Sequence, residues 1–450
     1  NKPLYDPDND FLIGNSGGIL MNIDFIVINI ERLSKAADTF DEYGTYCDYD
    51  PSTPAYESFW QRETSRRKKG VFIKAKLYYK DIPKFFDANT TDEERESLLQ
   101  PLRITGAHYT YLNYGRIERT PNDKERARLK REGAEHVETV MGFPRYWDGD
   151  YWNFKIDEFI ANNKFHLTKA KARRKGFSYK RGSQAANTIN LFPNVTVTLA
   201  ADQLAYLTDK GATTFMAKKC LDHFEEHTFW KRGYISEAID DILMGYRVST
   251  KGLKNFGWLS NLYSVAIGKN ESAAVGKKAI EIDFEEAGKC PNLQKALDVT
   301  LSNTESGAIS VGTIRVYGTG GTKGANWAAF SKAFYNPKMN KMLCMENVWD
   351  INKRHEVCGF FFPQVWDCEP YVERGNSIIF TAYAWDKQDK ENHFHNNDSE
   401  THIIYKAQRA NTPAEAFINT TENMFASPEL NLHVSDLIND NATRFFQDGW

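Results

Sequence analysis

Apolar and polar residues follow two periods along the middle of the chain, and together they predict strands that alternate with helices. The short apolar runs at 165–170, 195–200, 279–284 and 312–317 are typical of buried strands. A helix at 178–191 follows the first run, a helix from Gln203 into His223 follows the second, and hairpins occupy 244–267. This order predicts an α/β fold in which helices flank a mainly parallel sheet, with the ligand at the sheet's carboxyl edge.

The two flanks of this core have different patterns. Residues 1–100 predict an α-rich region, with a β-like run at 70–77 and a capped helix at 90–99 whose N-cap is Thr91. The segment 121–136 is almost wholly charged and predicts an exposed helix or a loop. Further on, the pattern predicts extra strands, separated by a polar loop at 387–400; they lie at 357–362, 377–383 and 402–405.

A basic segment at 171–178 lies between the first predicted strand and its helix, where a phosphate-binding loop would stand. Such loops read G-x-x-x-x-G-K-[ST]: amides cradle the phosphates, the lysine neutralises them and the hydroxyl ligates Mg²⁺. Here Gly176 and Ser178 keep the last glycine and the hydroxyl, and Phe177 takes the lysine position. Lys171 stands in place of the first glycine. The alternative interpretation is a basic turn exposed to solvent.

Two adjacent carboxylates, Glu285 and Glu286, follow the strand at 279–284. Such a pair suits ATP hydrolysis, because one carboxylate can hold Mg²⁺ through water while the next orients the attacking water. We assign Glu285 to the metal and Glu286 to catalysis. Asp283 is a rival metal ligand, although its alternation with apolar residues places it partway along the strand. The other interpretation is an acidic turn that merely ends the strand.

A glycine-rich turn, Gly318-Thr319-Gly320-Gly321-Thr322, ends the strand at 312–317. Its glycines permit close backbone approach or positive φ. In helicase-like ATPases a turn in this position senses the γ-phosphate. The order of basic loop, Glu-Glu strand and Thr-Gly-Gly strand therefore predicts a nucleotide-hydrolysing site.

These three motifs resemble those of the large terminase subunit of tailed bacteriophages, the motor that pumps DNA into proheads. The early Lys171 with the ending Gly-Phe-Ser, the Glu-Glu-Ala-Gly at 285–288 and the Thr-Gly-Gly at 319–321 are similar to that family's motifs. Residues 412–417 with Met424 and Phe425 resemble the segment that closes its ATPase domain. Segments at 103–114 and 143–147 resemble those near its adenine pocket. The resemblance covers roughly 100–430, and its aromatic-rich character suggests a divergent, crAss-like lineage.

The resemblance implies a P-loop NTPase fold of the RecA/ASCE-like kind with ATP and Mg²⁺ as cofactors. It implies a catalytic role for Glu286 and for Arg173 or Arg174, since a guanidinium fits the charge that develops on a transferring phosphoryl group. Which arginine acts, and whether in cis or in trans, stays open. The metal ligands are Ser178 and Glu285. The remaining nucleotide contacts are assigned to Lys171, Lys175, Gly176, Phe177, Ser178, Thr319, Gly320, Gly321, Tyr146 and Trp147.

The same resemblance implies partners and a domain plan. The expected partners are double-stranded viral DNA, the portal protein, the small terminase subunit and further copies of the chain in a ring on the portal, in the host cytoplasm. We expect an N-terminal region at 1–100, an ATPase domain at 101–430 and the start of a linker at 431–450. The family's RNase H-like nuclease domain is not expected here, because only Asp436, Asp440 and Asp448 remain after Glu429. We therefore expect no DNA cleavage. The chain begins with Asn1 rather than Met, so we expect part of a longer protein.

Composition limits how the chain could contact DNA, what its cysteines do and whether it could span a membrane. The 450 residues are 41% apolar and carry a net charge of −3, so DNA contact would need local basic patches; candidates are 66–69, 124–131 and 169–180. Six cysteines without C-x-x-C or zinc spacing predict free thiols. Asn22, Asp24 and Asn29 interrupt the most apolar N-terminal window, so it cannot span a membrane.

Two other functions stay open. One is a helicase or another P-loop translocase, which would need a second RecA-like domain. The other is a capsid or DNA-binding protein that hydrolyses nothing because Phe177 marks a decayed site. ATP turnover with and without DNA separates them.

Overall fold

The computed structural model describes residues 4–6, 11–13, 19–20, 36–37, 39–40, 43–77, 91, 100–249, 253–270, 272–274, 278–306, 309–320, 325–350, 353 and 356–418. Gly321, Met424, Phe425, the expected helix at 90–99 and the region 431–450 lie outside these residues, apart from Thr91 itself.

The core is one eight-stranded sheet in which six neighbouring strands run parallel. The strands β10 and β11 extend one edge in antiparallel pairing. In spatial order the strands are β10 (Tyr234–Ala238), β11 (Asp241–Met244), β14 (Asn261–Ala266), β9 (Thr196–Ala201), β15 (Glu281–Phe284), β18 (Thr313–Thr319), β8 (Leu167–Lys171) and β21 (Phe360–Phe362). Because β18 lies between β8 and β15, the three predicted motifs end at one edge of the sheet.

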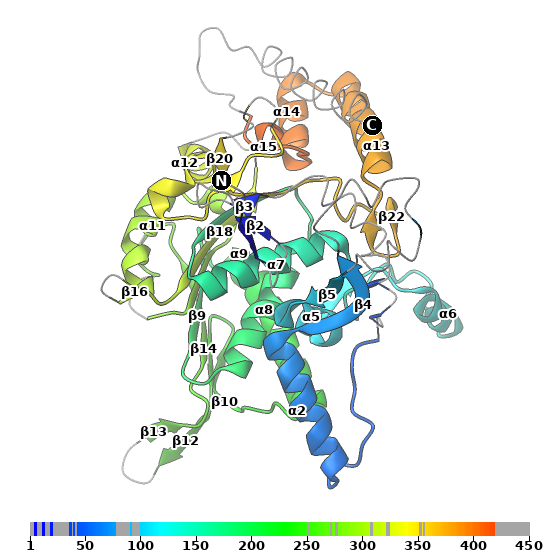
Figure 1. Cartoon of the computed structure of the whole chain (residues 1–450), viewed down its shortest axis with the longest axis vertical. Helices are drawn as coiled ribbons and strands as arrows, with labels where there is room; N and C mark the ends of the chain where they lie inside the picture. The colour runs from blue at the N-terminus through cyan, green and yellow to red at the C-terminus, as the bar shows by residue number, and fades with distance from the viewer. Residues whose placement is uncertain are drawn as a thin grey trace.

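Helices cover both faces of the sheet (Figure 1). One face carries α5 (Gly106–Tyr114), α7 (Asp148–Asn163), α8 (Phe177–Leu191) and α10 (Thr213–His227), and the other carries α11 (Leu293–Leu301) and α12 (Ala325–Tyr335). Alternation along the strands divides the core accordingly: Leu199, Phe360 and Phe362 pack toward the first face, whereas Ala200 and Phe361 pack toward the second. The predicted mainly parallel sheet flanked by helices is thus confirmed.

Smaller elements surround this core. The remaining helices are α2 (Pro54–Lys69), α6 (Asp123–Arg131), α9 (Ala205–Thr208), α13 (Ile379–Asn396), α14 (Ser399–Gln408), α15 (Pro413–Ala416) and the 3-10 turns η1 (Ala287–Lys289), η2 (Ser302–Thr304) and η3 (Pro337–Asn340). Two-stranded ribbons pair β4 (Val71–Leu77) with β5 (Gln100–Ile104), β6 (Ile117–Arg119) with β7 (Val140–Gly142), β12 (Tyr246–Ser249) with β13 (Leu253–Phe256), β16 (Glu305–Ser306) with β17 (Ile309–Ser310), and β22 (Val372–Glu373) with β23 (Asn376–Ser377). A five-stranded sheet joins β1 (Leu4–Asp6), β2 (Phe11–Ile13), β3 (Ile19–Leu20), β19 (Met345–Glu346) and β20 (Val357–Cys358).

Two predictions of secondary structure were wrong. The expected strands at 377–383 and 402–405 lie mainly in the helices α13 and α14, and most of the expected loop at 387–400 belongs to the same helices. Short runs rich in Ile, Phe and Tyr fit either period, and here buried Asp386 and Lys390 form an ion pair one helical turn apart that fixes the helix. The helix expected from Gln203 into His223 is interrupted between α9 and α10, where Gly211 has a φ of +83°.

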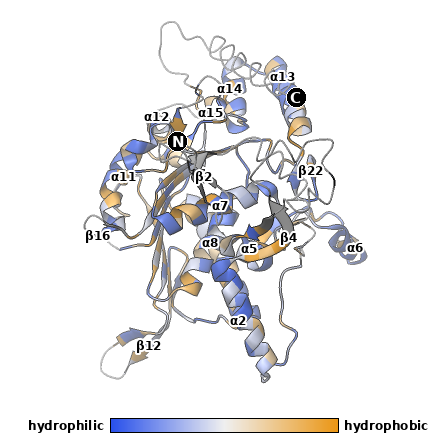
Figure 2. Cartoon of the chain, in the orientation of Figure 1, coloured by the Kyte–Doolittle hydropathy of each residue, from blue (hydrophilic) through white to orange (hydrophobic). Residues whose placement is uncertain are grey.

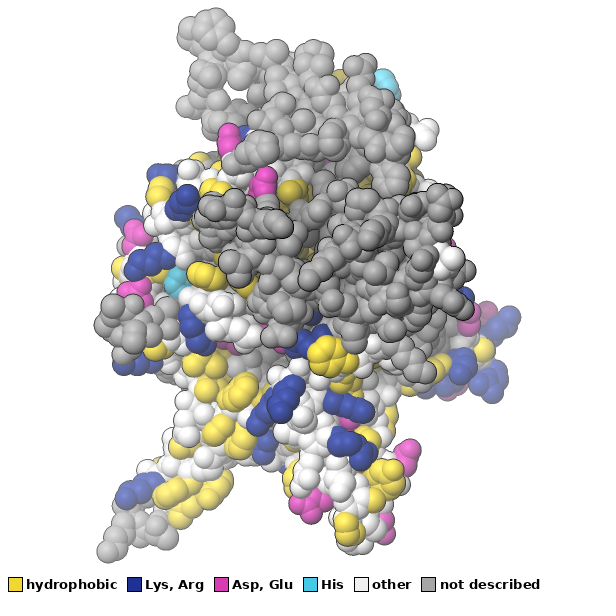
Figure 3. All heavy atoms as spheres, viewed as in Figure 1, with side chains coloured by type: hydrophobic (Ala, Val, Ile, Leu, Met, Phe, Trp, Pro, Cys, Tyr) yellow, Lys and Arg dark blue, Asp and Glu magenta, His cyan; other side chains and the backbone are white. Residues whose placement is uncertain are grey.

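The charged segments behave differently from one another. The exposed helix predicted within 121–136 is present as α6, begun by a capping box between Asn122 and Glu125. Figure 2 shows α2 and α6 as largely hydrophilic, and Figure 3 shows Lys and Arg side chains on the face that α2 forms. In the candidate patch 66–69, however, Arg67 is buried over the rings of Phe224 and Trp230, so only its neighbours reach solvent.

All six cysteines are free thiols, as predicted. Within the described residues, no helix combines the length and the apolar character that crossing a bilayer requires.

Candidate functional site

The predicted phosphate loop connects β8 to α8 with two residues in the left-handed backbone region. Arg174 has a φ of +61° and Gly176 a φ of +64°. A Cβ on Gly176 would meet its nearest atom, Lys180 Cε, at 3.8 Å, so the backbone conformation rather than space favours glycine. The turn directs the first amides of α8 toward the carboxyl edge of the sheet, where a helix N-terminus favours anions.

A cavity of about 440 Å³ lies over this loop and collects residues from all three motifs. It is lined by Lys171, Arg173, Arg174, Lys175, Gly176, Phe177, Ser178, Tyr179, Gly211, Glu286, Gly288, Lys289, Thr319, Gly320, Trp327 and Gln408. The structure therefore brings together most of the predicted site residues, which run from Lys171 to Gly320 in the sequence.

Lys171 and Thr319 meet at the floor of the cavity. They are paired in the register of β8 and β18, and Lys171 Nζ donates a hydrogen bond of 3.1 Å to Thr319 Oγ1. Phe177, in the usual lysine position, is buried against the rings of Tyr317 and Phe362. Its side chain belongs to the core, so only its backbone amide is available to a phosphate.

Glu285 is buried at the tip of β15 and is held by hydroxyl groups. Ser178 Oγ donates to Glu285 Oε1 at 2.6 Å, and Thr213 Oγ1, at the start of α10, donates to Oε2. Burial raises the pKa of Glu285 to about 7, against the opposing effect of these hydrogen bonds. A carboxyl group that burial disfavours in its ionised form gains most from a cation placed beside it.

The donors at this point fit magnesium. In the described part of the chain, no cluster of three or more His, Cys, Asp or Glu side chains forms a complete metal cage. Mg²⁺ does not require one, because it is usually held by one or two carboxylates together with substrate phosphates and water. Ser178 and Glu285 would hold the ion.

Glu286 follows with a φ of +50°, an unusual backbone conformation for a residue with a Cβ. Its half-buried side chain lines the cavity, whereas Glu285 does not. Lys289 Nζ lies 3.8 Å from Glu286 Oε2. Thus the two adjacent carboxylates occupy different environments, one buried among hydroxyls and one open to the cavity.

The basic residues of the loop are engaged to different degrees. The backbone N–H of Arg173 donates to the carbonyl of Gln408 at 2.7 Å, and its guanidinium donates to Gln408 Oε1 at 2.8 Å. Arg174 is exposed and makes no hydrogen bond or ion pair with the described residues. Lys175 is buried and donates to the carbonyls of Gln364 and Trp366, both at 2.6 Å.

Gly320 serves packing as well as lining the cavity. A Cβ on Gly320 would lie 2.1 Å from the carbonyl oxygen of Ala416, and one on Gly318 would lie 2.9 Å from Ala287 N. The predicted close backbone approach is therefore present, but its described partners are the chain's own α15 and the turn after β15.

Tyr146 and Trp147, predicted to contact the nucleotide, line a different cavity of about 920 Å³. Tyr146 is buried and stacks on His108 and Phe40. Neither residue lines the cavity over the phosphate loop. Their contact with a nucleotide stays a prediction.

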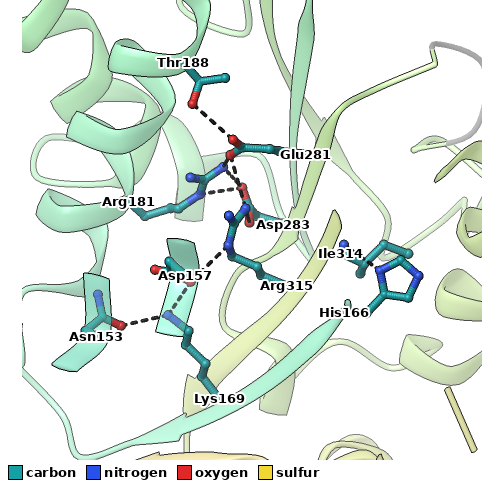
Figure 4. Close-up of polar contacts among 10 residues, drawn as sticks. All are labelled: Asn153, Asp157, His166, Lys169, Arg181, Thr188, Glu281, Asp283, Ile314 and Arg315. Carbon is teal, nitrogen blue, oxygen red and sulfur yellow. Dashed lines mark hydrogen bonds and ion pairs between the residues drawn. The ribbon is translucent and has the colours of Figure 1, made fainter. Parts of the chain in front are cut away.

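A buried network of charges joins α7, α8, β8, β15 and β18 (Figure 4). Arg181 Nε donates to Asp283 at 2.6 Å and its Nη2 pairs with Glu281; Arg315 donates to Glu281 at 3.1 Å. Further links join Arg315 to Asp157 at 3.0 Å, Asp157 to Lys169 at 2.7 Å, Lys169 to Asn153 at 2.8 Å and Thr188 to Glu281 at 3.1 Å.

This network settles where Asp283 points and shows what sequence reasoning missed. Asp283 is fully buried and paired, partway along β15 as predicted, whereas Glu285 reaches the hydroxyls at the strand's tip. The spacing 281, 283 and 285 puts three carboxylates on one face of a strand, and that signal could have predicted buried cationic partners. Nothing in the sequence singles out Thr213.

The sheet order, the loop after β8 and the carboxylates after β15 define an α/β P-loop NTPase fold. No protein-family model matches the chain, and no curated protein matches it in sequence.

Solved structures provide distant likenesses. The large terminase ATPase domain of Thermus phage P74-26 is 12% identical, with 64% of this chain and 98% of that chain covered and a TM-score of 0.38. The large terminase of bacteriophage HK97 is 13% identical, with 58% and 50% covered and a TM-score of 0.32. The SWI2/SNF2 ATPase core of Sulfolobus solfataricus, in complex with dsDNA, is 12% identical, with 39% and 32% covered and a TM-score of 0.24. These likenesses are too distant to carry an argument about function.

Proposed function

We propose that this chain is the ATPase of a motor that packages double-stranded viral DNA into a prohead. The observation that supports hydrolysis is the meeting of Lys171, Ser178, Glu286 and Thr319 around one cavity, with Glu285 directly beneath Ser178. A cation, a hydroxyl and two carboxylates are the groups that phosphoryl transfer to water requires.

Each side chain has a role that follows from its position. The ammonium of Lys171 neutralises phosphate charge from the floor of the cavity, in place of the lysine that Phe177 replaces. The carboxylate of Glu286 faces the cavity, orients a water molecule and accepts its proton. Mg²⁺, when bound, would neutralise the charge on the phosphates and polarise them. Ser178 and Glu285 would hold it.

The motor function rests on the sequence motifs described above, which resemble those of large terminase subunits. We further propose a ring of copies on a portal protein, recruitment by a small terminase subunit and action in the host cytoplasm. The exposed Arg62, Arg66, Lys68 and Lys69 on α2 offer a local basic surface on a chain whose net charge is negative. Binding of duplex DNA through such side chains would weaken as salt is raised.

ATP turnover with and without Mg²⁺ and duplex DNA tests this function, with Lys171→Ala as the informative variant. The variant should remain folded and lose most of its turnover; its unfolding midpoint is measured as well, because Lys171 is buried and hydrogen-bonds Thr319. Lys210→Ala is the matched control, because Lys210 forms an exposed 3.3 Å pair with Glu118 and no other ion pair with the described residues.

Absence of turnover in the wild-type protein would overturn the enzymatic proposal. Turnover that Lys171→Ala leaves unchanged would move the phosphate-binding role to Lys175 or Lys180. If the protein hydrolyses ATP but does not bind duplex DNA at low salt, and DNA does not stimulate the hydrolysis, the result would count against a DNA motor.

A further inference from the structure

Both carboxylate oxygens of Glu285 accept a hydrogen bond, and the two donors come from different helices. Ser178 on α8 holds Oε1, and Thr213 on α10 holds Oε2. Among the described residues, no cation forms an ion pair with Glu285. Its orientation in the protein is therefore set by two neutral hydroxyls.

The hydroxyl of Thr213 is placed by a rigid surrounding. Thr213 is fully buried, and its neighbour Thr214 hydrogen-bonds Ser264 on β14 at 2.7 Å. On the other side, Gly182 lets α8 approach so closely that a Cβ there would lie 2.6 Å from the carbonyl oxygen of Thr213. The first turn of α10 is thus fixed against both the sheet and α8.

The two hydroxyl donors differ in their position relative to a bound nucleotide and its magnesium ion. Ser178 has the position whose hydroxyl ligates magnesium in phosphate loops, and a lone pair of its Oγ can do so while its O–H donates to Glu285 Oε1. Thr213 does not line the cavity. Thr213 would therefore hold Oε2 alone, while Ser178 and the ion would share the side of Oε1.

We propose that Thr213 is a positioning residue for magnesium: by holding Oε2, it keeps Oε1 of Glu285 on the side of Ser178, where the ion would bind. The inference rests on the proposed function. Groups that hold a metal-binding carboxylate typically change metal affinity by about 10- to 100-fold when removed.

The test compares three variants by the affinity of Mn²⁺ for the ADP complex, followed by electron paramagnetic resonance. Thr213→Val removes the hydroxyl at nearly constant shape and should weaken Mn²⁺ binding by about tenfold or more. Thr213→Ser keeps a hydroxyl and should restore it. Thr214→Val is the matched control: it removes an equally buried hydroxyl one residue away, which bonds Ser264 instead of Glu285.

Further readouts separate positioning from folding. ADP affinity in the presence of a chelator should be the same in all variants, and the Mg²⁺ concentration for half-maximal ATP turnover should rise in Thr213→Val alone. Wild-type Mn²⁺ affinity in Thr213→Val, an equal loss in Thr214→Val or no rescue by Thr213→Ser would each overturn the proposal.

Failure of the proposed function has its own signature. A wild-type protein that binds ADP and Mn²⁺ but does not hydrolyse ATP refutes the ATPase, while the Mn²⁺ affinities still decide the role of Thr213. A wild-type protein that binds no ADP refutes both.

Discussion

The start and the tip of β15 carry the same kind of side chain in opposite circumstances. At the start, the charges of Arg181 and Arg315 outweigh burial and lower the pKa of Glu281 to about 2, whereas burial outweighs the same charges at Asp283 and raises its pKa. At the tip, burial raises the pKa of Glu285 to about 7. The interior carboxylates have their counter-charges inside the protein, whereas the tip is held by hydroxyls and can accept a cation from outside. Proximity to the cavity alone would not reveal this difference.

We expect the largest loss of stability when the interior network loses a cation. Arg315→Met leaves Glu281, Asp283 and Asp157 short of a partner, and removing one member of a buried ion pair costs about 3–5 kcal/mol. Denaturant unfolding should show this loss. Lys341→Ala is the control, because its 2.6 Å pair with Glu305 is exposed and should contribute no more than about 1 kcal/mol. Equal losses would mean that burial does not distinguish the two pairs.

Substitutions of the carboxylates at the tip should change ATP hydrolysis rather than stability. Glu286→Gln keeps the shape of the side chain but cannot accept a proton, so we expect retained Mg-ATP binding and hydrolysis slower by about 10² or more. Glu285→Gln should weaken the dependence on magnesium. Steady-state rates over a range of Mg²⁺ concentrations measure both. If Asp283→Asn weakens the dependence on magnesium while Glu285→Gln does not, the metal ligand lies in the middle of the strand.

The buried imidazole of His166 should make the stability of the protein depend on pH. His166, at the start of β8, accepts a 3.0 Å hydrogen bond from the backbone N–H of Ile314 on Nδ1, and burial lowers its pKa to about 4 (Figure 4). Between pH 6.5 and 4 the unfolded chain binds more protons than the folded one, so stability falls as pH falls through this window.

Between pH 7 and pH 5 this titration should cost about 2 kcal/mol of unfolding free energy. His166→Gln retains an acceptor but does not titrate, so its loss of stability over that range should be smaller by the same amount. Exposed His136→Gln is the control. Identical pH profiles for wild type and His166→Gln would show that the pKa of His166 does not differ between the folded and the unfolded chain.

The smallest effect concerns the exposed pair at the cavity. Lys289 lies 3.8 Å from Glu286, and both side chains are partly in solvent. Such pairs contribute about 1 kcal/mol or less, so Lys289→Ala should change both stability and turnover only slightly, by less than about fivefold in rate. A loss as large as that of Glu286→Gln would place the ammonium, too, among the groups that act on the substrate.

Local patterns predicted the core well because each motif there combines a strand with its own turn. The runs at 165–170, 279–284 and 312–317 correspond closely to β8, β15 and β18, and the parallel sheet then brings Lys171, Glu286 and Thr319 together. The strands expected at 377–383 and 402–405 were wrong because short apolar runs fit two periods, and their ion pairs decide between them only in three dimensions. Thr213 and Arg181 were missed for a related reason: their partners on β15 lie 70 or more residues away.

One consequence concerns how movement would pass through the site. At Gly318 and Gly320 the main chain of β18 touches the main chains of the turn after β15 and of α15, without side chains between them. In such a contact no side-chain torsion lies between the two main chains, so a displacement of one main chain passes directly to the other. We therefore expect the segments that carry Glu286, Thr319 and Ala416 to move together as one rigid unit.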